Sequence, residues 1–439
     1  MPIRRPNPTR GPAAFAALLV ITLVAAACGA ATPTPAPATP VASPSGPAAS
    51  SAATRGSTGQ DLVAVARTIE DQVVAIRALP RKSAVDPKAM DAAALRAFIE
   101  KDFAKENPAE RVAADERLAK VLGLLPAASS LADLYKELLT SQVVGLYSPE
   151  DKALYVLQTS GGLGPSERLI YSHEFTHALQ DQHFDLLAYT RAMQEPWESD
   201  RALARLSLVE GDATLVMTLW AQSNLTRQEL LKVVQDAADP KAAEIMARMP
   251  PILRETALFA YSQGGTFVSG LFQGGAWGPV DRAYAAPPDT TEQVMHPAKY
   301  TSREAPVAVA VPEGLAGRMG AGWSIGAEDT FGEFHLQVWL RGPTGAPSAG
   351  TATAAAGWGG DRVALLDGPN GVRAVALLTA WDTAQDAAEF AAAAKTAIDA
   401  YKLNAEIVAQ PGSKSVRVLV GSDDPTIDRL YQLLGASGV

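Results

Sequence analysis

Cysteine is almost absent from this sequence, because Cys28 is the only one among its 439 residues. A single cysteine excludes any disulfide bond within the chain, so stability outside a cell has to come from packing or from a bound metal ion. The P-loop and the dinucleotide-binding fingerprint are also missing. The single cysteine lies near the N-terminus and is a poor candidate for a catalytic nucleophile, which argues against a cysteine hydrolase.

Positive charge is scarce as well. The chain has 38 lysines and arginines against 47 aspartates and glutamates, and a formal net charge of −9. Residues 1–27 hold three of the arginines and no acid, so the rest of the chain carries 35 basic residues and a net charge of −12. This charge, and the absence of a nucleic-acid-binding motif, argue against a nucleic-acid partner.

Residues 1–27 are predicted to be a lipoprotein signal peptide. An apolar run from Ala13 to Ala27 follows the three arginines and is too short to span a bilayer comfortably. It ends in "LVAAACG", which resembles the lipobox of bacterial lipoproteins, with Cys28 as the lipidated residue. We therefore expect an extracytoplasmic protein anchored to the membrane by a lipid on Cys28, or a secreted protein if the lipobox is not used.

Residues 28–59 are predicted to be a tether, because they are rich in Pro, Ala, Ser and Thr and have few bulky apolar side chains to bury. Residues 60–140 are predicted to form a helical region that packs on the catalytic core. Apolar residues recur there at three- and four-residue intervals, beginning with Leu62, Val65 and Ile69. Further helices are expected near 87–105, 108–123 and 130–140.

The pattern changes in residues 141–304, which are predicted to form the catalytic domain. Two β-rich runs, 142–147 and 153–157, flank "SPEDK" and predict a hairpin. A helix beginning at Pro165 follows it and carries "YSHEFTHALQDQHF". Three more helices are expected near 199–223, 226–249 and 252–272, and a loop near 286–300.

Residues 305–439 are predicted to form a smaller C-terminal α+β subdomain. Strands are expected near 362–367, 372–380, 404–409 and 414–420. Helices are expected in "TFGEFHLQVWLR", near 384–401 and near 425–435, the last with Asp424 as its N-cap. The predicted fold class is thus α+β, with a β-hairpin before the motif-bearing helix.

His173, Glu174 and His177 form the motif H-E-x-x-H. On a helix the two histidines lie on one face one turn apart, so both imidazoles can point at one ion. Glu174 lies about 100° around the helix from His173, close enough to act on a metal-bound water without being a ligand. Zinc accepts imidazole nitrogen and leaves a position open for water, so the motif predicts a Zn²⁺ site.

The preferred third ligand is Glu210, 33 residues after His177 in "SLVEGDATLVM", because an acid inside an apolar helical run needs a partner. The glycine at 211 suggests close approach of another helix, expected to be that of His173. Asp212 is either an acceptor for a ligating imidazole N–H or a fallback ligand. His183 is disfavoured, because Gln180 continues the helix and turns His183 about 120° away from His177.

With these residues the chain resembles the gluzincin branch of the zincin metallopeptidases. It is most similar to a family of peptidase-MA-like bacterial membrane or secreted proteins. The ordered motifs "GLYSPEDKALYV", "HEFTHALQDQHFDL", "VEGDAT", "YSQGGTFV" and "PPDTTEQVMHP" lie within residues 143–297. The resemblance implies a helix-rich, zincin-like catalytic domain. It also implies that the hairpin borders the active-site cleft and that its edge strand holds an extended peptide by β-augmentation.

Two residues are candidates for the donor that stabilises the oxyanion. His296 is the first choice, because it lies in the polar, proline-flanked stretch "TTEQVMHPAKY". Tyr261 in "YSQGG" is the second, with core packing as its other interpretation.

The sequence therefore predicts a zinc-dependent metallopeptidase acting on peptide or protein substrates. His173, His177 and Glu210 would hold zinc, and Glu174 would activate a zinc-bound water that attacks the peptide carbonyl. The alternative is a non-catalytic zinc-binding envelope lipoprotein, with a structural or chaperone-like role. A solute-binding lipoprotein would need two parallel α/β lobes, which the helix-rich first half does not favour.

Overall fold

The computed structural model describes residues 59–140, 145–157, 162–191 and 198–435. The predicted signal peptide, Cys28 and nearly all of the predicted tether lie outside these residues. No helix in the described part is long and apolar enough to cross a membrane.

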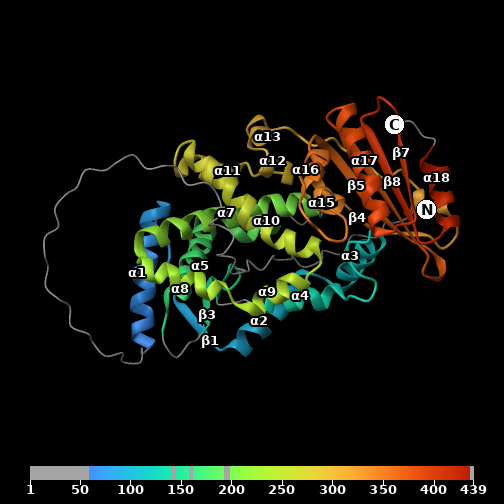
Figure 1. Ribbon diagram of the computed structural model, residues 1–439. Coiled ribbons are helices and arrows are strands. Elements are labelled where there is room, and N and C mark those ends of the chain that lie inside the picture. The colour runs from blue at the N-terminus through green and yellow to red at the C-terminus, as the bar shows by residue number, and fades with distance from the viewer. Residues whose placement is uncertain (1–58, 141–144, 158–161, 192–197, 436–439) are drawn as a thin grey trace, which may run out of the picture.

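The chain forms a helix-rich α+β fold with two small sheets (Figure 1). The helices of the first part are α1 (Gly59–Arg77), α2 (Ala92–Glu106), α3 (Ala109–Val121), α4 (Leu131–Thr140), α5 (Pro165–Phe184), α6 (Leu186–Arg191), α7 (Ser199–Asn224), α8 (Arg227–Ala237), α9 (Pro240–Arg248), α10 (Pro251–Gln273), α11 (Trp277–Ala285), α12 (Thr291–Met295) and α13 (Pro297–Ser302). Those of the last part are α14 (Leu315–Met319), α15 (Gly332–Leu340), α16 (Ala349–Ala355), α17 (Ala384–Tyr401) and α18 (Asp424–Leu434).

The first sheet has the strand order β1-β3-β2, with β1 (Pro87–Met90), β2 (Gly145–Ser148) and β3 (Ala153–Leu157). The predicted hairpin is confirmed, because β2 pairs antiparallel with β3. Residues 142–144 of its first strand lie outside the described residues. The prediction of a helix from residue 87 is wrong at its start: 87–90 form β1, which pairs parallel with β3, and Asp91 then caps α2.

The helix that carries the motif forms as predicted. Gly164 is the N-cap of α5 and Pro165 occupies its first turn, where the missing N–H costs no hydrogen bond. The helix ends at Phe184 because Asp185 has a left-handed backbone conformation, with φ of 51°. It is buried along one continuous stretch, from Leu169 to Asp181.

Other boundaries differ from prediction for identifiable reasons. The single helix expected over 226–249 is two helices, because Asp239 accepts a hydrogen bond from the Lys241 N–H and Pro240 begins α9. The loop expected near 286–300 contains α12, which Thr290 caps, and α13. The N-cap of α18 is Asp423 rather than Asp424.

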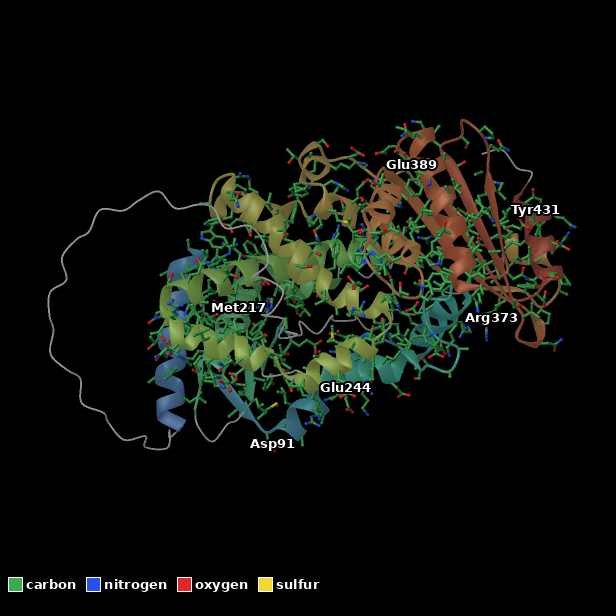
Figure 2. The ribbon with its side chains drawn as sticks, viewed as in Figure 1. Asp91, Met217, Glu244, Arg373, Glu389 and Tyr431 are labelled. Atoms are coloured by element: carbon green, nitrogen blue, oxygen red, sulfur yellow. The ribbon has the colours of Figure 1, made fainter. Side chains whose placement is uncertain are left out.

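The second sheet is antiparallel throughout, with the strand order β4-β5-β6-β8-β7. Its strands are β4 (Ser324–Asp329), β5 (Trp358–Asp367), β6 (Arg373–Trp381), β7 (Ala405–Ala409) and β8 (Ser415–Gly421). Alternate residues of β6 enter different cores: Val375 and Leu377 face α15, α16 and α17, whereas Ala376 and Leu378 face α14 and α18. Accordingly, Glu389 on α17 and Tyr431 on α18 lie on opposite sides of the sheet (Figure 2).

The N-terminal helices divide between the two parts of the molecule. α1 packs on α5 and α7, where Ile69 and Val73 share a core with Trp220. α3 instead packs on the second sheet and buries Leu118 in its core (Figure 1). Arg117 of α3 also forms a 3.0 Å ion pair with Asp367 of β5.

Candidate metal centre

Helices α5 and α7 bring His173, His177 and Glu210 together. The Nε2 atom of His173 lies 3.1 Å from Glu210 Oε2, and that of His177 lies 3.7 Å from the same oxygen. One potential ligand atom from each residue lies within 4.8 Å of the others. The two imidazoles, one turn apart on α5, and the carboxylate on α7 therefore form a buried His–His–Glu group that can bind a metal ion.

The electrostatics of this group favour a bound cation. His173 and His177 are fully buried and Glu210 is only 1% exposed. Burial lowers the pKa of His173 to about 3 and that of His177 to about 4, so both imidazoles are neutral at pH 7. Burial raises the pKa of the Glu210 carboxyl to about 7. Within the described part of the chain, His177 Nε2 has no hydrogen-bond partner, so a buried lone pair remains available for a metal ion.

Glu174 lies beside the group and is held by the first sheet. Its Oε2 atom accepts a 2.8 Å hydrogen bond from the backbone N–H of Tyr147 in β2. Its Oε1 atom is buried and has no partner among the described residues. Burial, and then the neighbouring Glu210 carboxylate, raise the pKa of Glu174 well above its ordinary value. One oxygen of Glu174 is thus fixed and the other is free to exchange a proton.

The hydrogen bond between Tyr147 and Glu174 also affects β2, the edge strand that was expected to bind a peptide. All four residues of β2 are buried, and the outward N–H of Tyr147 is already bonded to Glu174. In this conformation β2 therefore cannot receive an added strand at Tyr147, contrary to the expectation from the family resemblance.

Tyr261 of α10 lies next to the metal-binding group. Its hydroxyl donates a hydrogen bond to the Glu210 carboxylate, and its ring centroid lies 6.1 Å from that of His173. The residue is only partly buried. Its hydroxyl therefore lies at the group itself, which makes Tyr261 the oxyanion-donor candidate that the structure brings there.

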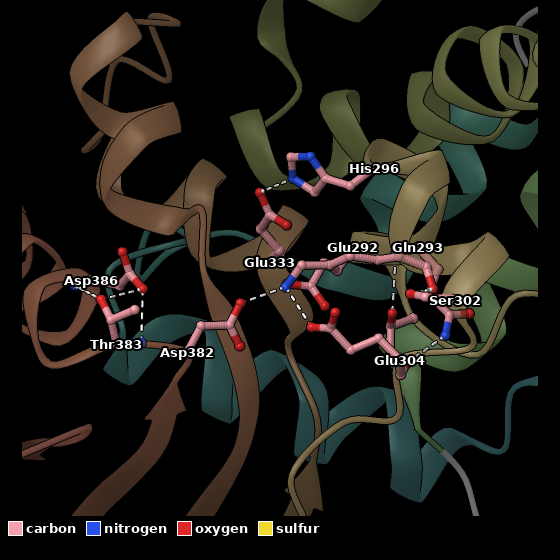
Figure 3. A network of polar contacts seen from close by, with 11 residues as sticks. Glu292, Gln293, His296, Ser302, Glu304, Glu333, Asp382, Thr383 and Asp386 are labelled. Carbon is pink, nitrogen blue, oxygen red and sulfur yellow. Dashed lines mark hydrogen bonds and ion pairs between the residues drawn. The ribbon is translucent and has the colours of Figure 1, made fainter.

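His296 lies elsewhere. The segment before it is fastened to the start of α7, where the Thr291 N–H donates to Asp200. Asp200 precedes Glu210 by ten residues, which is about 15 Å along the helix. The ring of His296 instead contacts the carboxylate of Glu333 on α15, at 2.9 Å (Figure 3). The structure therefore does not bring His296 to the metal-binding group.

A second set of acidic side chains lies near His296 and surrounds a lysine. The ammonium of Lys299 lies 2.6 Å from Glu292, 2.8 Å from Glu304 and 2.6 Å from Asp382 (Figure 3). Because a cation of the chain itself occupies the centre of this set, we do not assign a metal ion to it.

The alternative third ligands do not join the group. His183 donates from Nε2 to the carbonyl of Pro80 at 2.7 Å, consistent with its predicted orientation away from His177. Asp212 is fully buried and accepts hydrogen bonds from Arg77, Gln180 and Tyr284. It therefore supports the group from outside and does not contact the histidines.

The close approach predicted at Gly211 is real, but the expected neighbour is wrong. A Cβ atom at Gly211 would lie 2.2 Å from the backbone oxygen of Gly264, which belongs to α10 rather than to the histidine helix. Likewise, a Cβ atom at Gly264 would lie 2.2 Å from the oxygen of Ser207. The pair of glycines lets α7 and α10 pack closely, which also places Tyr261 near Glu210.

Three residues that support the group were missed in the sequence. Gln180 contacts the ring of His177, Arg77 contacts Asp212, and Tyr147 contacts Glu174 through its backbone. A polar Gln180 in a buried helix was a detectable signal. Arg77 is 135 residues from Asp212 and Tyr147 acts through its main chain, so neither left a local signal.

The comparisons with known proteins concern the other part of the chain. Residues 323–430 match the model of a family described as a domain of unknown function, DUF8575. The match runs from β4 into α18 and does not include the metal-binding group. No curated protein and no solved structure matches the chain.

Proposed function

We propose that this protein is a zinc-dependent metallopeptidase of the gluzincin type. The observation that carries the proposal is the convergence of His173, His177 and Glu210 from two helices, with a free oxygen of Glu174 beside them. The hairpin before α5 and the helical surroundings agree with a zincin-like catalytic domain. The signal-peptide and lipobox resemblance supports an extracytoplasmic, membrane-anchored enzyme.

Two imidazoles and one carboxylate suit Zn²⁺, and three protein ligands leave a coordination position open, as in catalytic zinc sites. When bound there, zinc would lower the pKa of a coordinated water toward neutrality and polarise the substrate carbonyl.

Residues of the chain would carry out proton transfer, hold the general base in place and stabilise the oxyanion. Glu174 would take a proton from the attacking water on its free Oε1 and pass it to the leaving amine. The Tyr147 N–H would keep the other oxygen of Glu174 in place. Tyr261 is better placed than His296 to donate to the oxyanion, because it already contacts the group.

One observation favours the alternative of a non-catalytic zinc-binding lipoprotein. His173, Glu174 and His177 are fully buried, as residues around a structural ion would be. A structural zinc normally has four protein ligands, however, and the described residues bring three to this point. A peptidase additionally requires a movement that admits the substrate.

The test combines metal analysis with cleavage of a peptide library by the purified protein and by Glu174→Gln. The proposal predicts about one zinc per chain and cleavage that a chelator abolishes. The substituted protein should keep its zinc and lose activity by a factor of about 10² to 10⁴. Zinc binding without any cleavage by the unsubstituted protein would favour the non-catalytic alternative, and cleavage unaffected by the substitution would refute the proposed role of Glu174.

A further inference from the structure

We propose that Gln180 is a positioning residue that sets the tautomer of His177 and aims its Nε2 lone pair at the metal position. This inference rests on the proposed metal-binding function and concerns a residue that would not contact the metal itself. It follows from the hydrogen-bonding capacities of the groups around one buried amide.

The contacts of Gln180 leave one orientation for its side chain. The amide nitrogen lies 3.0 Å from the carbonyl oxygen of Val209 and 3.1 Å from Oδ2 of Asp212. A carbonyl oxygen and a carboxylate accept hydrogen bonds, so the group facing them has to be the NH₂ donor. The Oε1 atom must then face His177, whose Nδ1 lies 2.8 Å away.

The orientation of the amide determines the protonation of the imidazole. Because Oε1 of Gln180 can only accept, Nδ1 of His177 has to carry the proton. In the neutral ring Nε2 is then unprotonated. This is the buried atom that lacks a hydrogen-bond partner and lies 3.7 Å from Glu210 Oε2.

Gln180 also connects the two ligand-bearing helices. It lies on α5 with His177, and its amide donates to the carbonyl of Val209, the residue immediately before Glu210 on α7. One side chain therefore links the imidazole ligand to the segment that carries the carboxylate ligand, by hydrogen bonds on both sides.

Helix α1 holds this arrangement from outside. Asp212 Oδ2 accepts from Gln180 and from the hydroxyl of Tyr284 at 2.9 Å, while its Oδ1 accepts from Arg77 Nε at 2.7 Å. Arg77 is fully buried, is bonded also to Asp281 at 2.7 Å and lies over the ring of Trp277. A hydrogen-bonded chain thus runs from the last residue of α1 to the metal-binding imidazole.

His173 differs from His177 in its hydrogen bonding. Its Nδ1 atom has no partner in the described part of the molecule, so no outer acceptor holds this ring in the Nδ1–H form, and its Nε2 atom lies 3.1 Å from Glu210 Oε2. Only one of the two histidines is therefore preorganised by an outer hydrogen bond, and the substitution of Gln180 should affect His177 alone.

The experiment uses nitrogen-detected histidine NMR spectra of the metal-free protein near pH 7.5, together with zinc affinity measured by chelator competition. In the unsubstituted protein His177 is expected in the Nδ1–H form. In Gln180→Met this preference should disappear, and zinc affinity should fall about 10- to 100-fold, the usual cost of losing a residue that supports a metal ligand.

Gln182→Met is the matched control. Gln182 lies two residues further along the same helix and bonds to Lys82 and Ser83 instead of the metal-binding group. This variant should leave both the tautomer and the affinity unchanged, and circular dichroism should show that all variants are folded.

The outcomes separate this inference from the proposed function. A His177 ring that carries its proton on Nε2 in the unsubstituted protein would overturn the inference, whether or not zinc binds. Unchanged zinc affinity in folded Gln180→Met would also overturn it. Absence of zinc binding by the unsubstituted protein would instead refute the proposed function, while the tautomer measurement would still test the role of Gln180.

Discussion

At the scale of single residues, the group is defined by which polar atoms remain without partners. Asp212 accepts hydrogen bonds from three donors, and His183 donates one to a carbonyl oxygen. In contrast, His177 Nε2 and Glu174 Oε1 are buried and have no hydrogen-bond partner among the described residues. An unsatisfied buried polar atom costs about 1–3 kcal/mol, so such atoms on neighbouring residues of one helix are expected where a ligand replaces the missing partners.

The choice of third ligand gives the first prediction at this scale. Glu210→Ala should lower zinc affinity more than about 100-fold, beyond the cost of losing a residue that merely supports a ligand. His183→Ala is the control and should leave the zinc content unchanged, because His183 bonds to Pro80. Zinc per chain, measured after dialysis, decides between them. Loss of zinc in the histidine variant and its retention in the glutamate variant would indicate a metzincin-like site instead.

At the scale of the elements, the decisive feature is the contact between α7 and α10. Their close packing depends on Gly211 and Gly264, at which no side chain fits. This contact brings Tyr261 to Glu210. Glycine in a helix interior costs about 1 kcal/mol relative to alanine, so the two glycines allow the close approach of the backbones at the expense of helix stability.

Alanine substitutions test this contact directly. Gly211→Ala places a methyl group against the backbone of Gly264, which cannot move like a flexible side chain, and should destabilise the protein by about 3 kcal/mol. Gly270→Ala, also in α10, meets no atom within 4 Å and should be neutral or stabilise by up to about 1 kcal/mol. Urea unfolding measures both. Equal effects of the two substitutions would mean that the close approach does not govern stability.

At the scale of the whole molecule, the second sheet is joined to the helical part by buried carboxylates. Asp361 of β5 accepts hydrogen bonds from the backbone N–H groups of Phe331 and Gly332, where α15 begins, and from the indole of Trp358. Asp329 at the end of β4 accepts from the N–H of Ser199, the first residue of α7. The helix that carries Glu210 therefore starts on the edge of the C-terminal sheet.

This junction should make stability depend on pH. Burial raises the pKa of Asp361 from its ordinary value of 3.8 to about 6. Between these values the unfolded chain has lost the proton while the folded protein keeps it, so rising pH destabilises the fold, by up to about 3 kcal/mol. Asp361→Asn abolishes this titration. The stability advantage of the unsubstituted protein over Asp361→Asn should therefore shrink from pH 4 to pH 6.5.

Unfolding in urea at several pH values measures this difference. An advantage that stays constant, or grows with pH, would contradict the raised pKa of Asp361. Because both proteins share all other titrating groups, the comparison reports the contribution of Asp361 together with its coupling to Asp200 and Asp329.

Local sequence determined the elements that depend on neighbours in the chain. The hairpin, the start of α5 at Pro165 and the one-face placement of His173 and His177 follow from turn residues, proline geometry and helical period. The buried acid at Glu210 was visible as a charge in an apolar helix. These features need contacts over only a few residues, so their physical causes are present in the sequence itself.

The tertiary structure decided what depends on contacts between distant segments. β1 is a strand because β3 offers it hydrogen bonds, although its own four residues do not require that conformation. The glycine at 211 indicated that another helix packs closely, but it could not identify that helix as α10. The polar sequence around His296 could not show that its ring contacts Glu333. The hydrogen-bonded chain from Arg77 through Asp212 and Gln180 to His177 joins α1, α7 and α5. Only the packing of those helices brings its members within hydrogen-bonding distance.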